Sequence, residues 1–253
     1  MAYKAHNLIS EKHCFFGAEG GVSSGKYASL NTNLKSRDST ENVRRNFEII
    51  AEHFGCTLSN MCTVRQSVSK VAVLLNSPSF MQIAADGIVT KNPDLLIGIK
   101  TADCTPVLLA DYKNGVIGAA HAGWRGACAG IVESTVQLMI DNGAEPQSIA
   151  AAIGPFLQKK SFDCKDDMVK TFLAQSAENN KYFSRKENGL GYLFDMGKYV
   201  EDKLKRLGVK NIVNSGIDTY ADEKGYFSFR RNTHRRLIEE QYDYPTQYSC
   251  IKL

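Results

Sequence analysis

The sequence lacks any long apolar run. Its first residues, MAYKAHNLISEKHCFFG, contain no stretch that could serve as the apolar core of a secretion signal, and no window approaches the roughly 18 apolar residues of a transmembrane helix. These absences predict a cytoplasmic protein without a membrane partner. An excess of one charge is also missing, since 31 Lys and Arg residues stand against 27 Asp and Glu. This balance predicts no nucleic-acid partner and is compatible with small anionic ligands.

Paired cysteines are absent and histidines are few. The seven cysteines are scattered without a Cys-x-x-Cys pair, so neither a disulfide framework nor a cysteine-based zinc finger fits. A metal site built on histidine has only five candidates, at positions 6, 13, 53, 121 and 234. No internal repeat and no low-complexity linker divides the chain. We therefore expect one domain over residues 1–253.

The hydrophobic pattern predicts a mixture of helices and short strands. Apolar residues at helical spacing predict helices over 38–55, 126–143, 164–179 and 195–209. Short apolar runs bounded by turn residues predict strands over 70–76, 94–100, 106–111, 115–121, 147–154, 211–217 and 225–231. Because several strands follow one another through hairpins, the pattern favours an α/β fold of the α+β type with αββα layering over a doubly wound parallel sheet.

One stretch, TADCTPVLLADYKNGVIGAAHAGWRG, gathers a thiol, an imidazole, an indole and a guanidinium around a predicted hairpin. Its KNG turn pairs the two strands so that Pro106 lies opposite His121. Cys104 then projects from the same face as His121, with Cβ atoms roughly 7 Å apart. One substrate atom or one metal ion could contact both side chains. Ordinary packing of a Cys–His pair is the alternative.

The residues after His121 add a possible anion site. Arg125 stands at the predicted start of a helix, where free N–H groups beside a guanidinium are typical of anion binding. A tight turn with Arg125 in a surface ion pair is the alternative. Asp86 and Gly87, in AADGIVT, are interpreted as a turn in preference to a catalytic carboxylate.

The motifs ADGIVT, KTADCTPVLLAD, GAAHAGWRGACAGI and AAIGP resemble those of the bacterial YfiH-like family, also called the laccase-domain or multicopper polyphenol oxidase family. GGVSSGKYASLN and DTYADEKGYFSFRR extend the resemblance over nearly the whole chain. It implies an αββα domain, one Zn or Cu ion, and phosphorolysis of adenosine, inosine or methylthioadenosine together with deamination of adenosine. Copper-dependent oxidation of phenols and peptidoglycan editing are further activities described for the family.

The resemblance makes Cys104 and His121 two metal ligands, and it also exposes three departures. The third ligand of the family is the His of a Gln-Val-His-Gly or Gln-Thr-His-Ser motif, and here that position holds Val68. The Arg that commonly precedes Gly-Gly-Val-Ser is Ala18, and a Gly-Arg pair near the C-terminus is replaced by Pro245-Thr246. A catalytic Zn²⁺ ordinarily keeps three protein ligands, so the metal site is one ligand short.

The expected site residues beyond the two ligands fall into two groups. The candidates to replace the missing ligand are His13, His234 and Asp103. For the substrates, a purine nucleoside and phosphate, we expect contacts from Ser23, Asn31, Asp103, Arg125, Arg230 and Arg231.

These observations leave several functions open. A bound metal ion would activate water for deamination or polarise the purine during phosphorolysis. Without a metal ion, Cys104 and His121 form the pair of a cysteine hydrolase, such as a peptidoglycan-editing amidase, with the helix start as oxyanion support. A copper-dependent oxidase and a non-catalytic binder that keeps the pocket are the remaining alternatives. We expect a metal-dependent purine nucleoside phosphorylase with adenosine deaminase activity.

Overall fold

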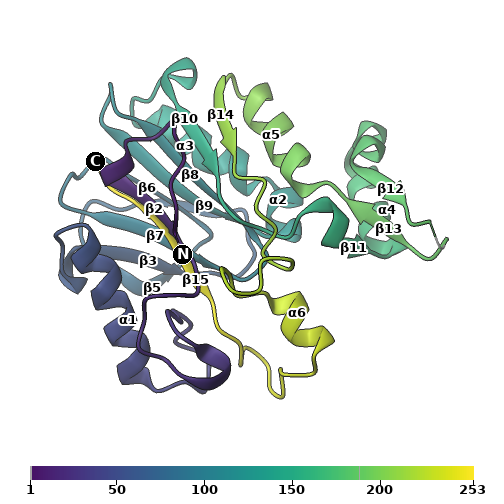
Figure 1. Cartoon of the computed structure of the whole chain (residues 1–253). Helices are drawn as coiled ribbons and strands as arrows, with labels where there is room; N and C mark the ends of the chain where they lie inside the picture. The colour runs from purple at the N-terminus through teal and green to yellow at the C-terminus, as the bar shows by residue number, and fades with distance from the viewer. Residues whose placement is uncertain (1, 188) are drawn as a thin grey trace.

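Two six-stranded sheets form the framework of the computed structural model, which describes residues 2–187 and 189–253 (Figure 1). The first sheet has the order β1 (Ala2–Tyr3), β2 (His13–Phe16), β15 (Gln247–Ile251), β7 (Leu96–Thr101), β3 (Met61–Arg65) and β5 (Phe80–Ala84). The second has the order β14 (Asn211–Asn214), β10 (Ala150–Ile153), β8 (Thr105–Asp111), β9 (Val116–Ala122), β6 (Gly87–Thr90) and β4 (Ala72–Leu74). A small third sheet contains β11 (Asp163–Cys164), β13 (Tyr192–Phe194) and β12 (Phe183–Arg185).

Helices α1 (Thr40–His53), α3 (Ile131–Asp141) and α5 (Met196–Arg206) cover the outer faces of the two large sheets, and α4 (Asp166–Gln175) lies beside the small third sheet (Figure 1). Two shorter helices are α2 (Trp124–Ala129) and α6 (Phe229–His234). Helix α1 packs on the first sheet, and α3 and α5 pack on the second (Figure 1). None of the helices within the described ranges has the length and apolarity that a bilayer crossing requires.

One apolar cluster lies under the helices on each large sheet, and a third lies between the two sheets. The first sheet contributes Phe15, Ile97 and Ile99, and the second contributes Leu108 and Ile117, all of them fully buried. Alternating side chains of each sheet therefore pack inward against the other sheet and outward against helices. This order of layers confirms the predicted mixed α/β fold.

Several predicted elements differ from those in the structure. The helix predicted over 164–179 ends at Gln175, and a separate 3-10 helix follows over Ala177–Tyr182. The helix predicted over 126–143 is divided at Gly130, whose φ of 106° lies in the left-handed region and ends α2 before α3 begins. The strand predicted over 225–231 is wrong, because α6 begins at Phe229. The Ser228 side chain accepts a hydrogen bond from the Arg231 N–H, and this cap stabilises a helix start.

Just after β10, the backbone of the second sheet lies against a side chain of the first. A side-chain carbon on Gly154 would lie 2.1 Å from the Phe15 ring, far inside van der Waals contact. Glycine is therefore required here because the aromatic ring of one sheet lies against the backbone of the other.

We expect Gly154→Ala to lower the free energy of unfolding by about 1–3 kcal/mol, because the new methyl group overpacks the contact with Phe15. Urea denaturation checks this. In a double-mutant cycle, Phe15→Leu should relieve part of the penalty. Strictly additive effects of the two substitutions would contradict the interpretation.

Candidate functional site

The predicted hairpin brings Cys104 and His121 together. Strands β8 and β9 pair antiparallel with Pro106 opposite His121, as the sequence predicts. Cys104 immediately precedes β8 and lies close enough to His121 to influence the charge of its ring. The pairing of the strands therefore fixes the position of both side chains.

Asp86 is a third member of this group. Its carboxylate accepts a hydrogen bond of 2.8 Å from His121 Nδ1, and both residues are buried. The contact follows from the sheet, because β6 pairs with β9 and Gly87 lies opposite Ala120. The interpretation of Asp86 as a turn residue missed this contact. The signal that could have revealed it is the pairing of β6 with the His121 strand.

The same carboxylate organises the loop after β3. Asp86 accepts hydrogen bonds from the backbone N–H groups of Ser67, Val68 and Ser69 and from the Ser69 hydroxyl. Strands β3 and β7 run parallel, so the loops that follow them leave the sheet at the same edge. This arrangement places Val68 beside Cys104.

Charge is concentrated at this group. Burial by itself favours a neutral imidazole, but the Cys104 sulfur and the Asp86 carboxylate outweigh it and raise the pKa of His121 to about 9. Burial also opposes the charged form of Asp86, but the hydrogen bonds from His121 and Ser69 lower the pKa of this carboxyl. At neutral pH, His121 is therefore an imidazolium held by a carboxylate.

Val68 occupies the position where the resemblance requires a third metal ligand. A side-chain carbon on Gly123 would lie 3.2 Å from Cys104 Sγ, 3.3 Å from Val68 Cγ1 and 3.7 Å from His121 Cε1. The three side chains thus converge, with a methyl group in place of a donor atom. Val68 also has a φ of 59°, an unusual conformation for a β-branched residue.

The proposed replacements for this ligand do not join the group. His13 is buried elsewhere, where Nε2 accepts from the Ala5 N–H and Nδ1 donates to the Ile9 carbonyl. Within residues 2–187 and 189–253, no three His, Cys, Asp or Glu side chains are placed to hold a metal ion. The donor set of this chain therefore does not fit the Zn or Cu ion that the resemblance implies.

Asp103, expected as a replacement ligand or a substrate contact, lines the larger of two cavities at this site, and its carboxylate also has a structural role. Its carboxylate accepts hydrogen bonds from Thr219 Oγ1, Ser228 Oγ and the Arg230 N–H, so it ties the β7–β8 connection to the start of α6. Burial raises the pKa of Asp103, and these three donors oppose that rise. With φ at 81°, Asp103 also turns the chain so that Cys104 can enter β8.

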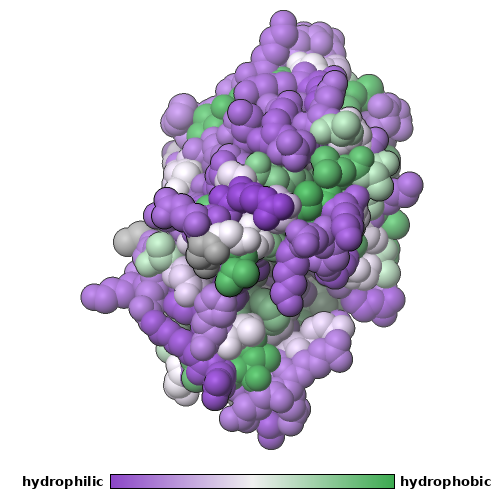
Figure 2. All heavy atoms as spheres, turned by 90° about the vertical axis from the view of Figure 1, so that its right-hand side faces the viewer, coloured by the Kyte–Doolittle hydropathy of each residue, from purple (hydrophilic) through white to green (hydrophobic). Residues whose placement is uncertain are grey.

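Two cavities meet at Cys104. The larger has a volume of about 500 Å³, within the usual range for small-molecule sites. Its walls include the apolar side chains of Trp124, Leu157, Phe162, Met168, Met196 and Phe229. Figure 2 views the molecule from the side of α4 and α6, where hydrophobic residues lie recessed between hydrophilic ones. The smaller cavity, of about 180 Å³, shares Ala102 and Cys104 with the larger one and also contains His121 and Val68.

The larger cavity receives two of the expected basic side chains. Arg230 lines it and donates to the Asp163 carboxylate and carbonyl. His234 also lines it, and its Nδ1 lies 3.0 Å from the Tyr220 hydroxyl. Neither residue is among those that converge on Gly123.

The other expected substrate residues lie outside both cavity walls. Arg125 is exposed, and its guanidinium stacks 4.1 Å above the Trp124 ring. Helix α2 has only six residues, and Arg125 lines neither cavity, so the expected anion site at this helix start stays a prediction. Arg231 is buried and donates to the carbonyls of Thr219, Tyr220 and Tyr226. It is therefore occupied in holding the backbone before α6.

Ser23 and Asn31, expected to contact the nucleoside, stabilise the N-terminal loop instead. Both are buried and donate to the Asp38 carboxylate at 2.6 and 2.9 Å. Asn46 of α1 donates to the Ser23 hydroxyl and to the Asn31 carbonyl. These contacts fasten the loop to α1 and leave neither side chain in a cavity wall.

Comparisons with known proteins agree with this architecture. A family model described as multi-copper polyphenol oxidoreductase laccase matches residues 12–237. The purine nucleoside phosphorylase of Deinococcus radiodurans is 35% identical over 90% of this chain and 87% of its own length. One from Rickettsia conorii is 40% identical, over 63% of this chain and 64% of that protein, so the match spans just under two thirds of that relative. The crystal structure of a DUF152 protein from Neisseria meningitidis superposes with a TM-score of 0.85 at 27% identity, covering 100% of this chain and 98% of that one.

We expect Val68→His to create a metal site, because it supplies a third donor beside Cys104 and His121 and because histidine adopts positive φ more readily than valine. Zinc bound after loading and gel filtration should rise from well below one to about one ion per chain. Val68→Asn, which suits the backbone but is a poor zinc ligand, is the control. Equal zinc content in all three proteins would contradict the expectation.

The buried imidazolium predicts a pH-dependent stability. The pKa of His121 is about 9 in the folded chain and about 6.5 when unfolded, so its contribution is fully present below pH 6.5 and is lost as the pH rises through 9. The loss should reach about 3 kcal/mol. Urea denaturation between pH 6 and 10 measures it, and His121→Gln should remove this part of the dependence. An identical slope in both proteins would refute the assignment.

Proposed function

Because this chain belongs to the family described as multi-copper polyphenol oxidoreductase laccase, we propose that it shares the activity named for its relatives and is a purine nucleoside phosphorylase. The observation that carries the proposal is the meeting of two cavities at Cys104, beside the imidazolium of His121. Phosphorolysis needs two neighbouring substrate sites and a proton at the point where they meet.

The larger cavity suits the nucleoside. Aromatic and apolar side chains such as Trp124, Phe162 and Phe229 provide surfaces for a purine ring. Polar groups of α6, including Thr233 and His234, line the same cavity and can bind ribose hydroxyls. Adenosine, inosine and methylthioadenosine share this combination of a flat base and a polar sugar, and we propose them as the substrates to be tested.

His121 supplies the proton in this proposal. A phosphate oxygen attacks C1′ of the ribose, and the electron pair of the C1′–N9 bond moves to the purine. The purine takes a proton from His121, which recovers one from the attacking hydrogen phosphate, so ribose 1-phosphate and the free base leave with protons balanced. Asp86 keeps the imidazole oriented and charged before the transfer.

Phosphorolysis is favoured over the other activities that the resemblance implies. Deamination of adenosine and oxidation of phenols would both use a metal ion, to activate water or to carry electrons. The methyl group of Val68 lies where the third protein ligand of that metal ion is expected. The chemistry proposed here uses side chains that the chain does possess.

One observation favours a second candidate, a thiol hydrolase. Asp86, His121 and Cys104 follow one another in the order of an orienting carboxylate, a base and a nucleophile. Under this hypothesis, Cys104 would form an acyl-enzyme when the chain is incubated with an activated ester. Mass spectrometry of the intact chain would detect the added acyl group. Cys104→Ser and Cys104→Ala would both abolish the adduct.

The phosphorylase proposal is tested by incubating the chain with adenosine and phosphate and measuring free adenine and ribose 1-phosphate by chromatography. We expect His121→Gln to lower kcat by about 100-fold or more, because the proton donor is lost. Cys56 is partly buried, as Cys104 is, but lies in neither cavity wall. The control variant Cys56→Ala should therefore retain full activity. Adenine release that does not require phosphate would contradict the proposal, and inosine in its place would indicate deamination.

A further inference from the structure

The smaller cavity has an unusual distribution of charge. Lys35, Arg65 and Lys100 line it together with His121, and none of the described residues in its wall is an Asp or a Glu. Like charges that share a small cavity repel one another unless an anion compensates them. Because the phosphorylase needs a second substrate, we propose that this cavity binds inorganic phosphate. The inference rests on the proposed function and gives its co-substrate a site.

Lys100 is the innermost of these cations. It stands at the end of β7, half-buried, and Gln66 bonds to both its backbone N–H and its carbonyl, which fixes its place in the wall. Among the described residues, its ammonium group donates only to the Met81 sulfur, a weak acceptor, at 2.8 Å. Burial and the charge of Lys35 lower the pKa of Lys100 to about 7. An anion in the cavity would supply the partner that the protein does not.

Within residues 2–187 and 189–253, neither of the other two cations, Arg65 and Lys35, pairs with a carboxylate. The Arg65 side chain is exposed and has no hydrogen-bond or ion-pair partner in the part of the chain that the structure describes. Lys35 lies over the Tyr242 ring at 4.7 Å, a contact that positions the ammonium group without neutralising it. The Thr101 hydroxyl, in the same wall, is buried without a hydrogen-bond partner among the described residues. The wall therefore offers cationic donors and an unused hydroxyl.

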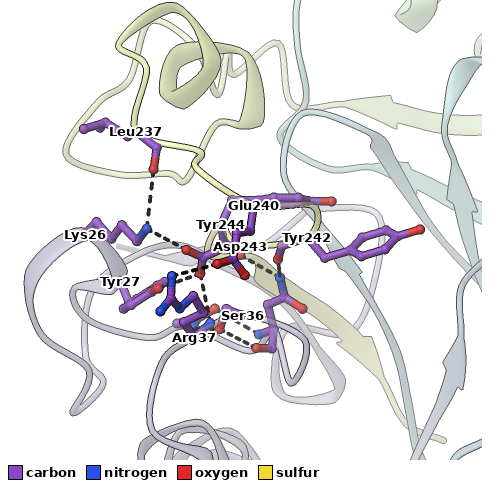
Figure 3. Close-up of polar contacts among 11 residues, drawn as sticks. Lys26, Tyr27, Ser36, Arg37, Leu237, Glu240, Tyr242, Asp243 and Tyr244 are labelled. Carbon is purple, nitrogen blue, oxygen red and sulfur yellow. Dashed lines mark hydrogen bonds and ion pairs between the residues drawn. The ribbon is translucent and has the colours of Figure 1, made fainter.

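The outer wall is held by a strap, residues 237–246, that crosses the N-terminal loop (Figure 3). Asp243 accepts hydrogen bonds from Lys26 Nζ, Tyr27 OH and the Arg37 N–H. Asn33 donates to the carbonyls of Tyr242 and Tyr244. In Figure 3 the Tyr242 ring extends away from these contacts. The strap thus fixes two tyrosines of the cavity wall.

Backbone strain is concentrated in the same wall. Val68, Met81 and Tyr242 have φ values of 59°, 58° and 69°, and all three residues line the smaller cavity. Such conformations are unfavourable for side chains of these types and persist only where surrounding contacts enforce them. The contacts around the wall therefore hold these three residues in conformations that are otherwise unfavourable.

The size of the cavity selects among phosphate sources. Its volume of about 180 Å³ is below the usual range for drug-sized ligands and suits a tetrahedral oxyanion better than a nucleotide. Its position across Cys104 from the larger cavity would direct a phosphate oxygen toward a nucleoside held on the other side. We therefore assign it to inorganic phosphate and not to the phosphoryl group of a nucleotide.

Calorimetric titration of the full chain with inorganic phosphate at low salt tests the site without any nucleoside. Lys100→Met and Arg65→Gln should each weaken phosphate binding about tenfold or more, because each removes a charged donor. Lys113→Met removes the same charge from the distant hairpin turn, where it pairs with Glu145, and should change the affinity less than about twofold. Lys100→Met should not lower the melting temperature, because it relieves a half-buried ammonium group.

Phosphate affinity that is unchanged in both variants, or no binding by the unsubstituted chain, overturns the assignment. Adenosine 5′-monophosphate that binds here in preference to inorganic phosphate overturns it as well. The two proposals fail separately. Normal phosphate binding without turnover of any nucleoside would refute the phosphorylase alone. Turnover whose KM for phosphate is unaffected by Lys100→Met and Arg65→Gln would refute this site alone.

Discussion

The buried pair of Asp86 and His121 is the interaction on which the site depends. One carboxylate fixes the imidazole of β9 and, through three backbone N–H groups, the shape of the loop that carries Val68. Loss of that charge would release both the ring and the loop, since a buried histidine and three N–H groups would lose a common acceptor. Cys104, which interacts with His121 of this pair, lies in the walls of both cavities.

Local spacing predicted part of this arrangement. The parity of the hairpin places Cys104 and His121 on one face, and the layering follows from strands joined by hairpins. Asp86 lies 35 residues from His121 and meets it through a strand pairing that local spacing does not specify. The start of α6 was missed because alternating aromatic residues suggest a strand, whereas the cap at Ser228 decides for a helix.

The basic cavity illustrates a different limit of sequence reasoning. Lys35, Arg65 and Lys100 belong to three separate segments, and none lies in a motif that indicates anion binding. The sequence instead directed attention to Arg125, whose neighbouring glycines are typical of phosphate loops, yet that side chain stacks on Trp124 at the surface. Charge becomes informative only when the fold shows which cations share a cavity and which already have a partner.

The position of β15 affects how the first sheet folds. This strand, residues 247–251, lies between β2 and β7, so the middle of the first sheet is vacant until these residues have been synthesised. Pairings between residues so distant in sequence form slowly, because the entropy of closing a large loop is lost before the new contacts contribute stabilising free energy. During synthesis on the ribosome, β2 and β7 would expose unpaired edges until β15 emerges, a period in which aggregation competes with folding.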